Sequence, residues 1–265
     1  MTASTSIHPK THHNHSALSA IGMLSKMELL RLIRNPIFVV VTLLLPIMFF
    51  AMFGIPNAKE HFGQISVGQY MLVSYSAYSL MTLCLTSFGT GVANERGMGW
   101  HRLIRVAPVP FVYLFIAKAF TAVLLGLIGI LGLTLFAGLV GGVTLAPLLA
   151  ATIYAKLLLG MLTFSALGLA IGYRCSPISA PAISNIIFLG MSFTSGMFIP
   201  LQTAPKFLQD IAEYIPAYHF AQLGWLSLSQ NTTPQGIHWL WLVGYTIVFL
   251  WIAYQGYRKD ETNRV

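Results

Sequence analysis

Six long apolar stretches occupy more than half of this chain and constrain its fold more than any other feature. They lie at about residues 37–55, 67–93, 111–140, 148–173, 178–198 and 237–257. Each is long enough to cross a bilayer, because about 20 apolar helical residues span a hydrocarbon core of about 30 Å. The chain is 56% hydrophobic and 8% charged, whereas roughly 25% charged residues is usual in soluble domains. The sequence therefore predicts an all-α integral membrane protein with six transmembrane helices.

The segments before the first stretch have a different character. Residues 1–16 are polar and hold His8, His12, His13 and His15, which indicates a disordered tail. A metal-capturing role is the alternative, although no Cys or carboxylate accompanies these histidines.

Residues 17–34 combine an apolar stripe with Lys26, Glu28 and Arg31 on another side, which predicts an interfacial amphipathic helix. Asn35-Pro36 should end this helix and begin the first span, because proline fits the first turn of a helix. Residues 17–257 are thus expected to form one transmembrane domain, with 258–265 as a cytoplasmic tail.

The basic residues predict the orientation of the spans. Eleven of the 15 Lys and Arg residues fall on one side of the predicted membrane, and only Lys59 and Lys206 fall on the other. The positive-inside rule then places both termini in the cytoplasm. The net charge of +8 is explained in this way, with anionic lipid rather than nucleic acid as its partner. Cys84 and Cys175 lie in different settings, so no disulfide is expected.

Several classes of active site are missing from the sequence. It contains no G-x-x-x-x-G-K-[ST], H-E-x-x-H or G-x-S-x-G motif. Every acidic residue maps to a loop, a tail or the interfacial helix, whereas an ion-coupled carrier needs an acid near the membrane midplane. We therefore expect no catalytic residue, no bound metal and an energy source outside this chain.

The loop after the second stretch, residues 94–110, is the best indication of that source. A short helix from about Trp100 to Val106, closed by Pro108 and Pro110, would present a charged amphipathic surface to a soluble partner. The alternative is an ordinary basic loop that sets topology.

This loop resembles the cytoplasmic loop of type 2 ABC exporter permeases, in which Glu-Arg precedes Gly, a Leu/Arg-rich short helix and Pro-Val. Here those residues are Glu95-Arg96, Gly97, Leu103 to Arg105 and Pro108-Val109, and Lys118 follows in the third stretch. Ser195 to Pro200 resembles the Ser-Gly-x-x-x-Pro pattern of that family. The resemblance covers about residues 17–257, while Met98 and Trp100-His101 depart from the usual loop.

The resemblance implies a division of labour between subunits. Two permease subunits, identical or homologous, form the pathway, and two copies of a separate ATPase subunit bind ATP and Mg beneath them. No cofactor is implied in this chain. The residues expected to couple it to the ATPase are Glu95, Arg96, Gly97, Arg102, Leu103, Arg105 and Pro108, with Arg174 to Pro177 as a smaller contact.

Polar side chains recur at helical spacing in the second and fifth stretches. They either pack between helices or line a substrate path. The residues concerned are Tyr75, Ser79, Thr82, Thr86, Asn185, Ser192 and Ser195.

The segment after Pro200 is predicted to dip back into the membrane as two short helices, forming an outer gate or a packed lid. Its candidate gate residues are Pro200, Phe207, Ile211, Tyr214 and Pro216.

Two lysines and two glycine pairs lie inside the predicted spans. Lys118 is close enough to the interface to snorkel, whereas Lys156 lies deeper and either snorkels outward or meets a partner in the bundle. Gly168-x-x-x-Gly172 and Gly138-x-x-x-Gly142 are candidate helix contacts.

These features favour the permease subunit of an ATP-driven exporter, dimeric in function, in the cytoplasmic membrane of a bacterium. An ion-coupled secondary carrier and a non-transport scaffold or catalytic subunit are the alternatives. A drug, lipid, glycan or peptide substrate is compatible with the sequence.

Overall fold

Helices dominate the computed structural model of the chain, which describes residues 17–62, 65–99, 111–198, 200–201, 204–229 and 234–262. The helical segments are α1 (Ala17–Ile33), α2 (Pro36–Val39), η1 (Val40–Leu44), α3 (Leu45–Phe49), η2 (Phe50–Gly54), α4 (Val67–Cys84), η3 (Leu85–Thr90), α5 (Gly91–Gly97), α7 (Phe111–Gly141), α8 (Pro147–Arg174), α9 (Ser179–Thr194), α10 (Lys206–Ala212), α11 (Pro216–Leu228) and α12 (Gly236–Thr262). Strands β1 (His61–Phe62) and β2 (Ile65–Ser66) pair antiparallel. The expectation of an all-α chain is therefore wrong at this short hairpin.

In the described part of the chain, five helices are long and apolar enough to cross a membrane. They are Pro36–Gly54, Val67–Gly97, Ile116–Gly141, Pro147–Arg174 and Gly236–Lys259. Their bounds agree with the predicted stretches within a few residues. The predicted stretch 178–198 differs, because α9 has only 16 residues and measures about 24 Å at 1.5 Å per residue.

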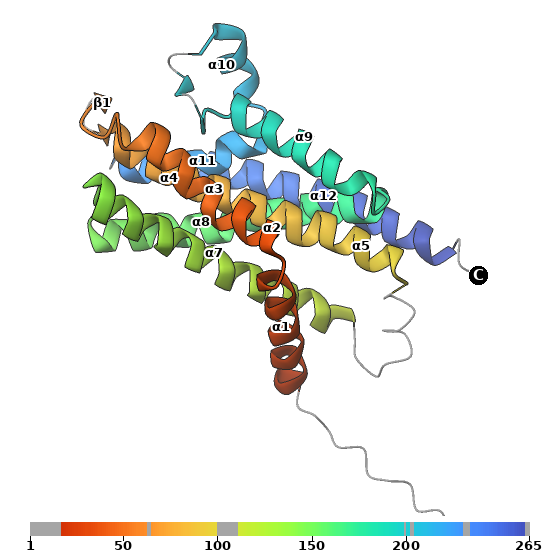
Figure 1. Cartoon of the computed structure of the whole chain (residues 1–265). Coiled ribbons are helices and arrows are strands. Elements are labelled where there is room, and N and C mark those ends of the chain that lie inside the picture. The colour runs from red at the N-terminus through yellow and green to blue at the C-terminus, as the bar shows by residue number, and fades with distance from the viewer. Residues whose placement is uncertain are drawn as a thin grey trace, which may run out of the picture.

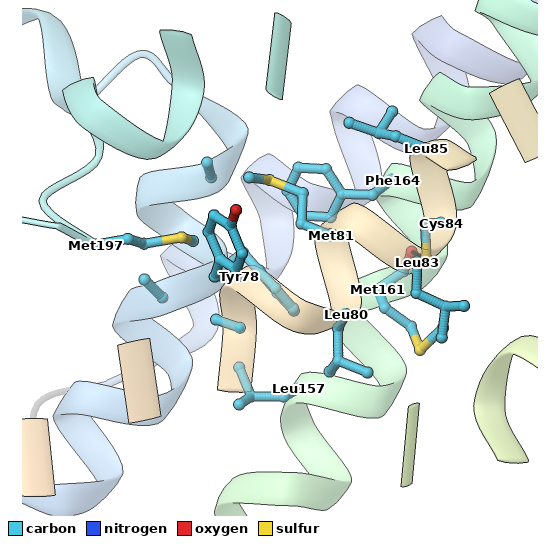
Figure 2. Close-up of a cluster of buried hydrophobic side chains, with 14 of the residues drawn as sticks. Tyr78, Leu80, Met81, Leu83, Cys84, Leu85, Leu157, Met161, Phe164 and Met197 are labelled. Atoms are coloured by element: carbon cyan, nitrogen blue, oxygen red, sulfur yellow. Dashed lines mark hydrogen bonds between the residues drawn. The ribbon is translucent and has the colours of Figure 1, made fainter. Parts of the chain in front are cut away.

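The burial of these helices shows which of them is central. In the most apolar window of Val67–Gly97, 94% of the residues are buried, against 11% for Gly236–Lys259. Figure 2 shows Leu80 and Met81 of α4 among Leu157, Met161 and Phe164 of α8, and all five side chains are buried. The segment α4–η3–α5 is thus the packed centre, and most of the apolar surface of α12 is exposed.

The boundary between α1 and the first span lies where the sequence predicts it. Asn35 caps α2, since its side chain accepts a hydrogen bond of 3.3 Å from the Phe38 N–H, and Pro36 occupies the first helical turn. Proline lacks the N–H that would otherwise be unpaired at this position.

Pro46 interrupts the hydrogen bonding of the first span, and a neighbouring helix compensates. A proline cannot donate to the carbonyl four residues before it, which here is that of Thr42. The Ser79 hydroxyl of α4 donates to this Thr42 oxygen at 3.0 Å. The π-helical segments η1 and η2 lie on either side of α3. A neighbouring helix thus satisfies the backbone group that Pro46 leaves unpaired.

The two glycine pairs have different roles. A Cβ at Gly168 would lie 2.9 Å from the Cys84 carbonyl oxygen, and one at Gly172 would lie 2.7 Å from that of Phe88. This pair therefore brings α8 against η3, as predicted. Gly142 has φ +64° and open space around it, and Val143 donates back to the Ala137 carbonyl at 3.0 Å. The predicted contact at Gly138 and Gly142 is wrong, because Gly142 ends α7.

The ends of the bundle can be named from the helices that meet there. The basic end holds Gly97, Phe111, Arg174 and Lys259, whereas the far end holds Val67, Gly141 and Pro147. Figure 1 shows α1 running crosswise to the long helices, with the C-terminal part of α12 at the basic end.

Candidate functional site

Four charged side chains meet where α1, α5 and α7 come together near the basic end. Lys118 of α7 donates to Glu28 of α1 at 2.8 Å and to Glu95 of α5 at 2.6 Å. Arg31 of α1 pairs with Glu28 at 2.7 Å and also with Glu95. We call Glu28, Arg31, Glu95 and Lys118 the charge junction. Its two carboxylates and two cations join three helices that lie far apart in the sequence.

Three of the four side chains in the charge junction are withdrawn from water, whereas the Arg31 side chain is 40% exposed. Lys118 is 3% exposed and Glu95 is 5% exposed. Removing one partner of a buried ion pair leaves an uncompensated charge in a medium of low polarity, which costs about 3–5 kcal/mol. The three helices therefore cannot separate here without a large penalty. The expectation that Lys118 snorkels is wrong, because Glu28 and Glu95 hold its ammonium inside the protein.

The packing of α1 explains why Glu28 reaches this position. Ser25 and Leu32 are buried, and the Thr121 hydroxyl of α7 donates to the Ser25 carbonyl at 3.3 Å. This face of α1 thus covers α7, whereas Leu18 at the start of α1 is 82% exposed. Glu28 was expected on the polar side, but only 11% of its side chain is exposed.

Arg96, which follows Glu95, connects the end of α5 to α8. Its guanidinium donates to the Gly172 carbonyl at 2.5 Å and to the Cys175 carbonyl at 3.3 Å, and it lies 5.6 Å from the Tyr173 ring centroid. Carbonyls at the end of a helix have no partner within the helix and attract cations. Glu95 therefore binds to α1 and α7, whereas Arg96 binds to α8.

Gly97 completes this contact with α8. A Cβ at Gly97 would lie 2.4 Å from the Pro177 ring, so the predicted loop Arg174 to Pro177 abuts the end of α5. The other predicted coupling residues, Arg102, Leu103, Arg105 and Pro108, lie outside the described residues. Glu95 and Arg96, expected as contacts of an ATPase, both have partners within this chain. Their place is directly before the predicted coupling segment.

A groove of about 210 Å³ collects part of the predicted polar lining. Thr82, Thr86 and Thr90 line it from the second span, while Ser184 and Asn185 line it from α9. The π-helical segment η3 contributes to this wall, and π-helical turns within α-helices are frequent at functional sites. The groove therefore offers hydroxyl and amide groups beside the central helix.

The remaining candidate path residues lie elsewhere. Tyr75 is fully buried with its ring 6.1 Å from Phe49 and 6.3 Å from Phe198. Ser79 supports the first span through Thr42, as described above. Ser192 and Ser195 are buried and donate to carbonyls of their own helix. The structure thus places these four side chains in packing roles.

The predicted gate residues lie at the opposite end of the protein. Some of them are buried and others are exposed. Pro216 begins α11 and is buried there, and Pro200 is also buried. Phe207, Ile211 and Tyr214 are exposed, and Figure 1 shows α10 standing away from the bundle beyond α9. Most of α11 is buried, including Phe220 against Phe164 of α8. The short α10 region therefore presents the predicted apolar face outward.

Lys156 of α8 has partners within the bundle. Its ammonium donates to the Ser227 hydroxyl of α11 at 2.7 Å and to the Gln235 side-chain oxygen at 2.9 Å. Of the two alternatives, the structure supports the paired lysine. A lysine thus joins α8 to α11 and to the residue before α12.

We expect Lys156→Met to lower the free energy of unfolding by about 1–2 kcal/mol, because hydrogen bonds to charged groups contribute about 1.5–3 kcal/mol and water replaces part of them at a half-buried site. Thermal unfolding in detergent measures this loss. Lys59→Met, at an exposed lysine before the β-hairpin, is the control. Equal stability of the two variants would contradict the pairing.

Sequence comparison now places this arrangement among known proteins. Residues 56–254 match the family described as "ABC-2 family transporter protein". The "Putative transport permease YvfS" of Bacillus subtilis (strain 168) is 28% identical over 235 residues, which cover 88% of this chain and 95% of that protein. The matched family region includes Glu95, Arg96 and Lys118, and the groove residues that come from the second span and from α9. The family match covers most of the chain, which is therefore a multi-pass membrane protein that belongs to the ABC-2 transporter family.

Proposed function

We propose that this chain is the permease subunit of an ATP-driven exporter in the cytoplasmic membrane of a bacterium. Two permease subunits form the pathway, and separate ATPase subunits dock at the basic end, which faces the cytoplasm with both termini. The observation that carries this proposal is the charge junction, together with Arg96, directly before the segment 100–110. Six spans are proposed, with α9 as the short fifth.

The charge junction gives a physical route for coupling. A partner that moves the segment between Gly97 and Phe111 pulls on α5 and α7 at the same time. Glu95 and Lys118 lie near the two ends of that segment and are bound to each other and to α1. Arg96 transmits the same displacement to α8 through the Gly172 carbonyl. Because separating the buried charges is costly, the four helices move as a unit.

The groove beside η3 is the proposed part of the pathway. Thr82, Thr86 and Asn185 line it, and its mixture of hydroxyl, amide and apolar groups suits amphiphilic molecules. At the far end, α10 with Phe207, Ile211 and Tyr214 forms the outer gate. We propose that α10 and α11 are the re-entrant helices expected between the fifth and sixth spans.

Co-purification from the native host tests the proposal. The tagged chain, extracted in mild detergent, should retain an ATPase subunit in equimolar amount, identified by mass spectrometry. Arg102→Ala/Arg105→Ala should lose this partner, while Lys206→Ala, at the far end, should keep it. A chain that purifies alone in several detergents would contradict the exporter and return the ion-coupled carrier and the scaffold to consideration.

Thr86→Trp tests the pathway. The indole is expected to fill the groove, so export of amphiphilic compounds to which the complex confers resistance should fall by at least about tenfold, with the ATPase still bound. Thr152→Trp, at an exposed position of α8, is the matched control. Undiminished export by Thr86→Trp would remove the groove from the pathway.

A further inference from the structure

Two histidines near the far end face each other and have no part in the proposed coupling or pathway. His219 lies in the first turns of α11, and His238 lies in the first turn of α12. Their Nδ1 atoms are 3.0 Å apart. His219 is 4% exposed and His238 is half-buried. The pair therefore joins the buried helix α11 to the largely exposed helix α12.

The surrounding groups fix the proton positions on the pair. The Nε2 atom of His219 lies 2.9 Å from the Glu213 carbonyl oxygen, which can only accept. Neutral His219 therefore carries its proton on Nε2 and directs the Nδ1 lone pair at His238. His238 must then donate through its own Nδ1.

This is the arrangement that prepares a histidine for a metal ion. Metal-binding imidazoles usually donate their other N–H to a carbonyl or carboxylate, which fixes the tautomer and the ring orientation. Glu213 supplies that carbonyl for His219. The His219 ring also stacks on Trp241, with centroids 5.2 Å apart and planes inclined by 10°. The lone pair is therefore held in one direction by both a hydrogen bond and an aromatic contact.

The separation of the two nitrogens suits chelation. Two nitrogens bound to one Zn²⁺ at about 2.0–2.1 Å in tetrahedral geometry lie about 3.3 Å apart. The Nδ1 atoms need to separate by only a few tenths of an ångström to reach this distance. His238 would move its proton from Nδ1 to Nε2 through solvent, so both nitrogens become ligands without any change in charge.

We propose that His219 and His238 chelate a borderline divalent cation, Zn²⁺ or a similar transition-metal ion, and thereby fasten α11 to α12. Within the described residues no group of three or more His, Cys, Asp and Glu side chains forms a metal site. Water molecules would complete the coordination of such an ion. The proposal concerns a metal site alone and does not depend on the exporter function.

Metal binding to the purified full-length chain tests this proposal. His8, His12, His13 and His15 are first replaced by Gln, because the tail would bind the same ions. Zn²⁺ titration should then give one site per chain, and Co²⁺ should produce the absorbance of nitrogen-bound cobalt. His219→Gln and His238→Gln should each weaken Zn²⁺ binding by at least about tenfold.

His61→Gln is the matched control, because His61 is an exposed histidine near the same end of the bundle. Gel filtration establishes that each variant is folded, and Zn²⁺ should raise the Tm of the control but not of the other two variants. Absence of Zn²⁺ binding by the tail-substituted chain would overturn the proposal. So would equal affinity of His61→Gln, His219→Gln and His238→Gln.

Discussion

Glu95→Gln is expected to destabilise the chain by about 3 kcal/mol, because it leaves the buried Lys118 ammonium and the Arg31 guanidinium with Glu28 as their one remaining partner in the charge junction. Unfolding in mixed detergent micelles measures this change. Asn94→Gln, at the exposed neighbouring residue, controls for a longer amide at the end of α5. Equal stability of the two variants would show that the charge junction makes no net contribution to the free energy of unfolding.

A double-mutant cycle separates the ion pair from simple loss of packing. Lys118→Met alone leaves two carboxylates against one guanidinium, whereas Glu95→Gln with Lys118→Met leaves the neutral pair Glu28 and Arg31. The double variant should therefore be more stable than the sum of the single effects predicts, by about 1–3 kcal/mol. Additive losses would indicate that Glu95 and Lys118 act independently. Reduced export by the double variant, with stability partly restored, would assign the junction to coupling.

Gly172→Ala is the second substitution with a large expected effect. The added methyl group would lie 2.7 Å from the Phe88 carbonyl oxygen and 2.9 Å from the Val92 Cβ. Neither atom is the end of a flexible side chain, so α8 and the second span must move apart. Overpacking of this kind costs about 1–3 kcal/mol and sometimes more. The shift would also displace the Gly172 carbonyl from Arg96.

Gly132→Ala supplies a control of the same chemistry and the opposite expected sign. Gly132 lies within α7, and a Cβ there has open space around it. Alanine in a helix interior is favoured over glycine by roughly 0.5–1 kcal/mol. Thermal unfolding should therefore show a lower Tm for Gly172→Ala and an equal or higher Tm for Gly132→Ala. A lower Tm in both variants would mean that loss of any glycine, rather than loss of the close contact with η3, destabilises the chain.

The sequence alone was sufficient to predict those features that a bilayer imposes on a helix. A helix that crosses hydrocarbon must be long, apolar and internally hydrogen-bonded, and these are local properties. The bounds of α7 and α8 and the boundary at Asn35-Pro36 could therefore be predicted. The motif around Glu95 and Arg96 also indicated the family. The predicted stretch 178–198 contains α9 but is longer, because Met197 and Phe198 continue the apolar run beyond the helix. The β-hairpin was missed, because each of its strands has only two residues.

The tertiary structure decided what each polar group does, because that depends on which helices are neighbours. Thr86 and Ser79 belong to one polar stripe, yet Thr86 lines the groove while Ser79 replaces the hydrogen bond that Pro46 lacks. Lys118 meets Glu28 across 90 residues of sequence. An unpaired charge is costly in the low-polarity interior of a membrane protein. A lysine inside a span therefore indicates that a partner exists, but it does not identify that partner. Helix packing alone supplies that partner, as it also brings His219 to His238.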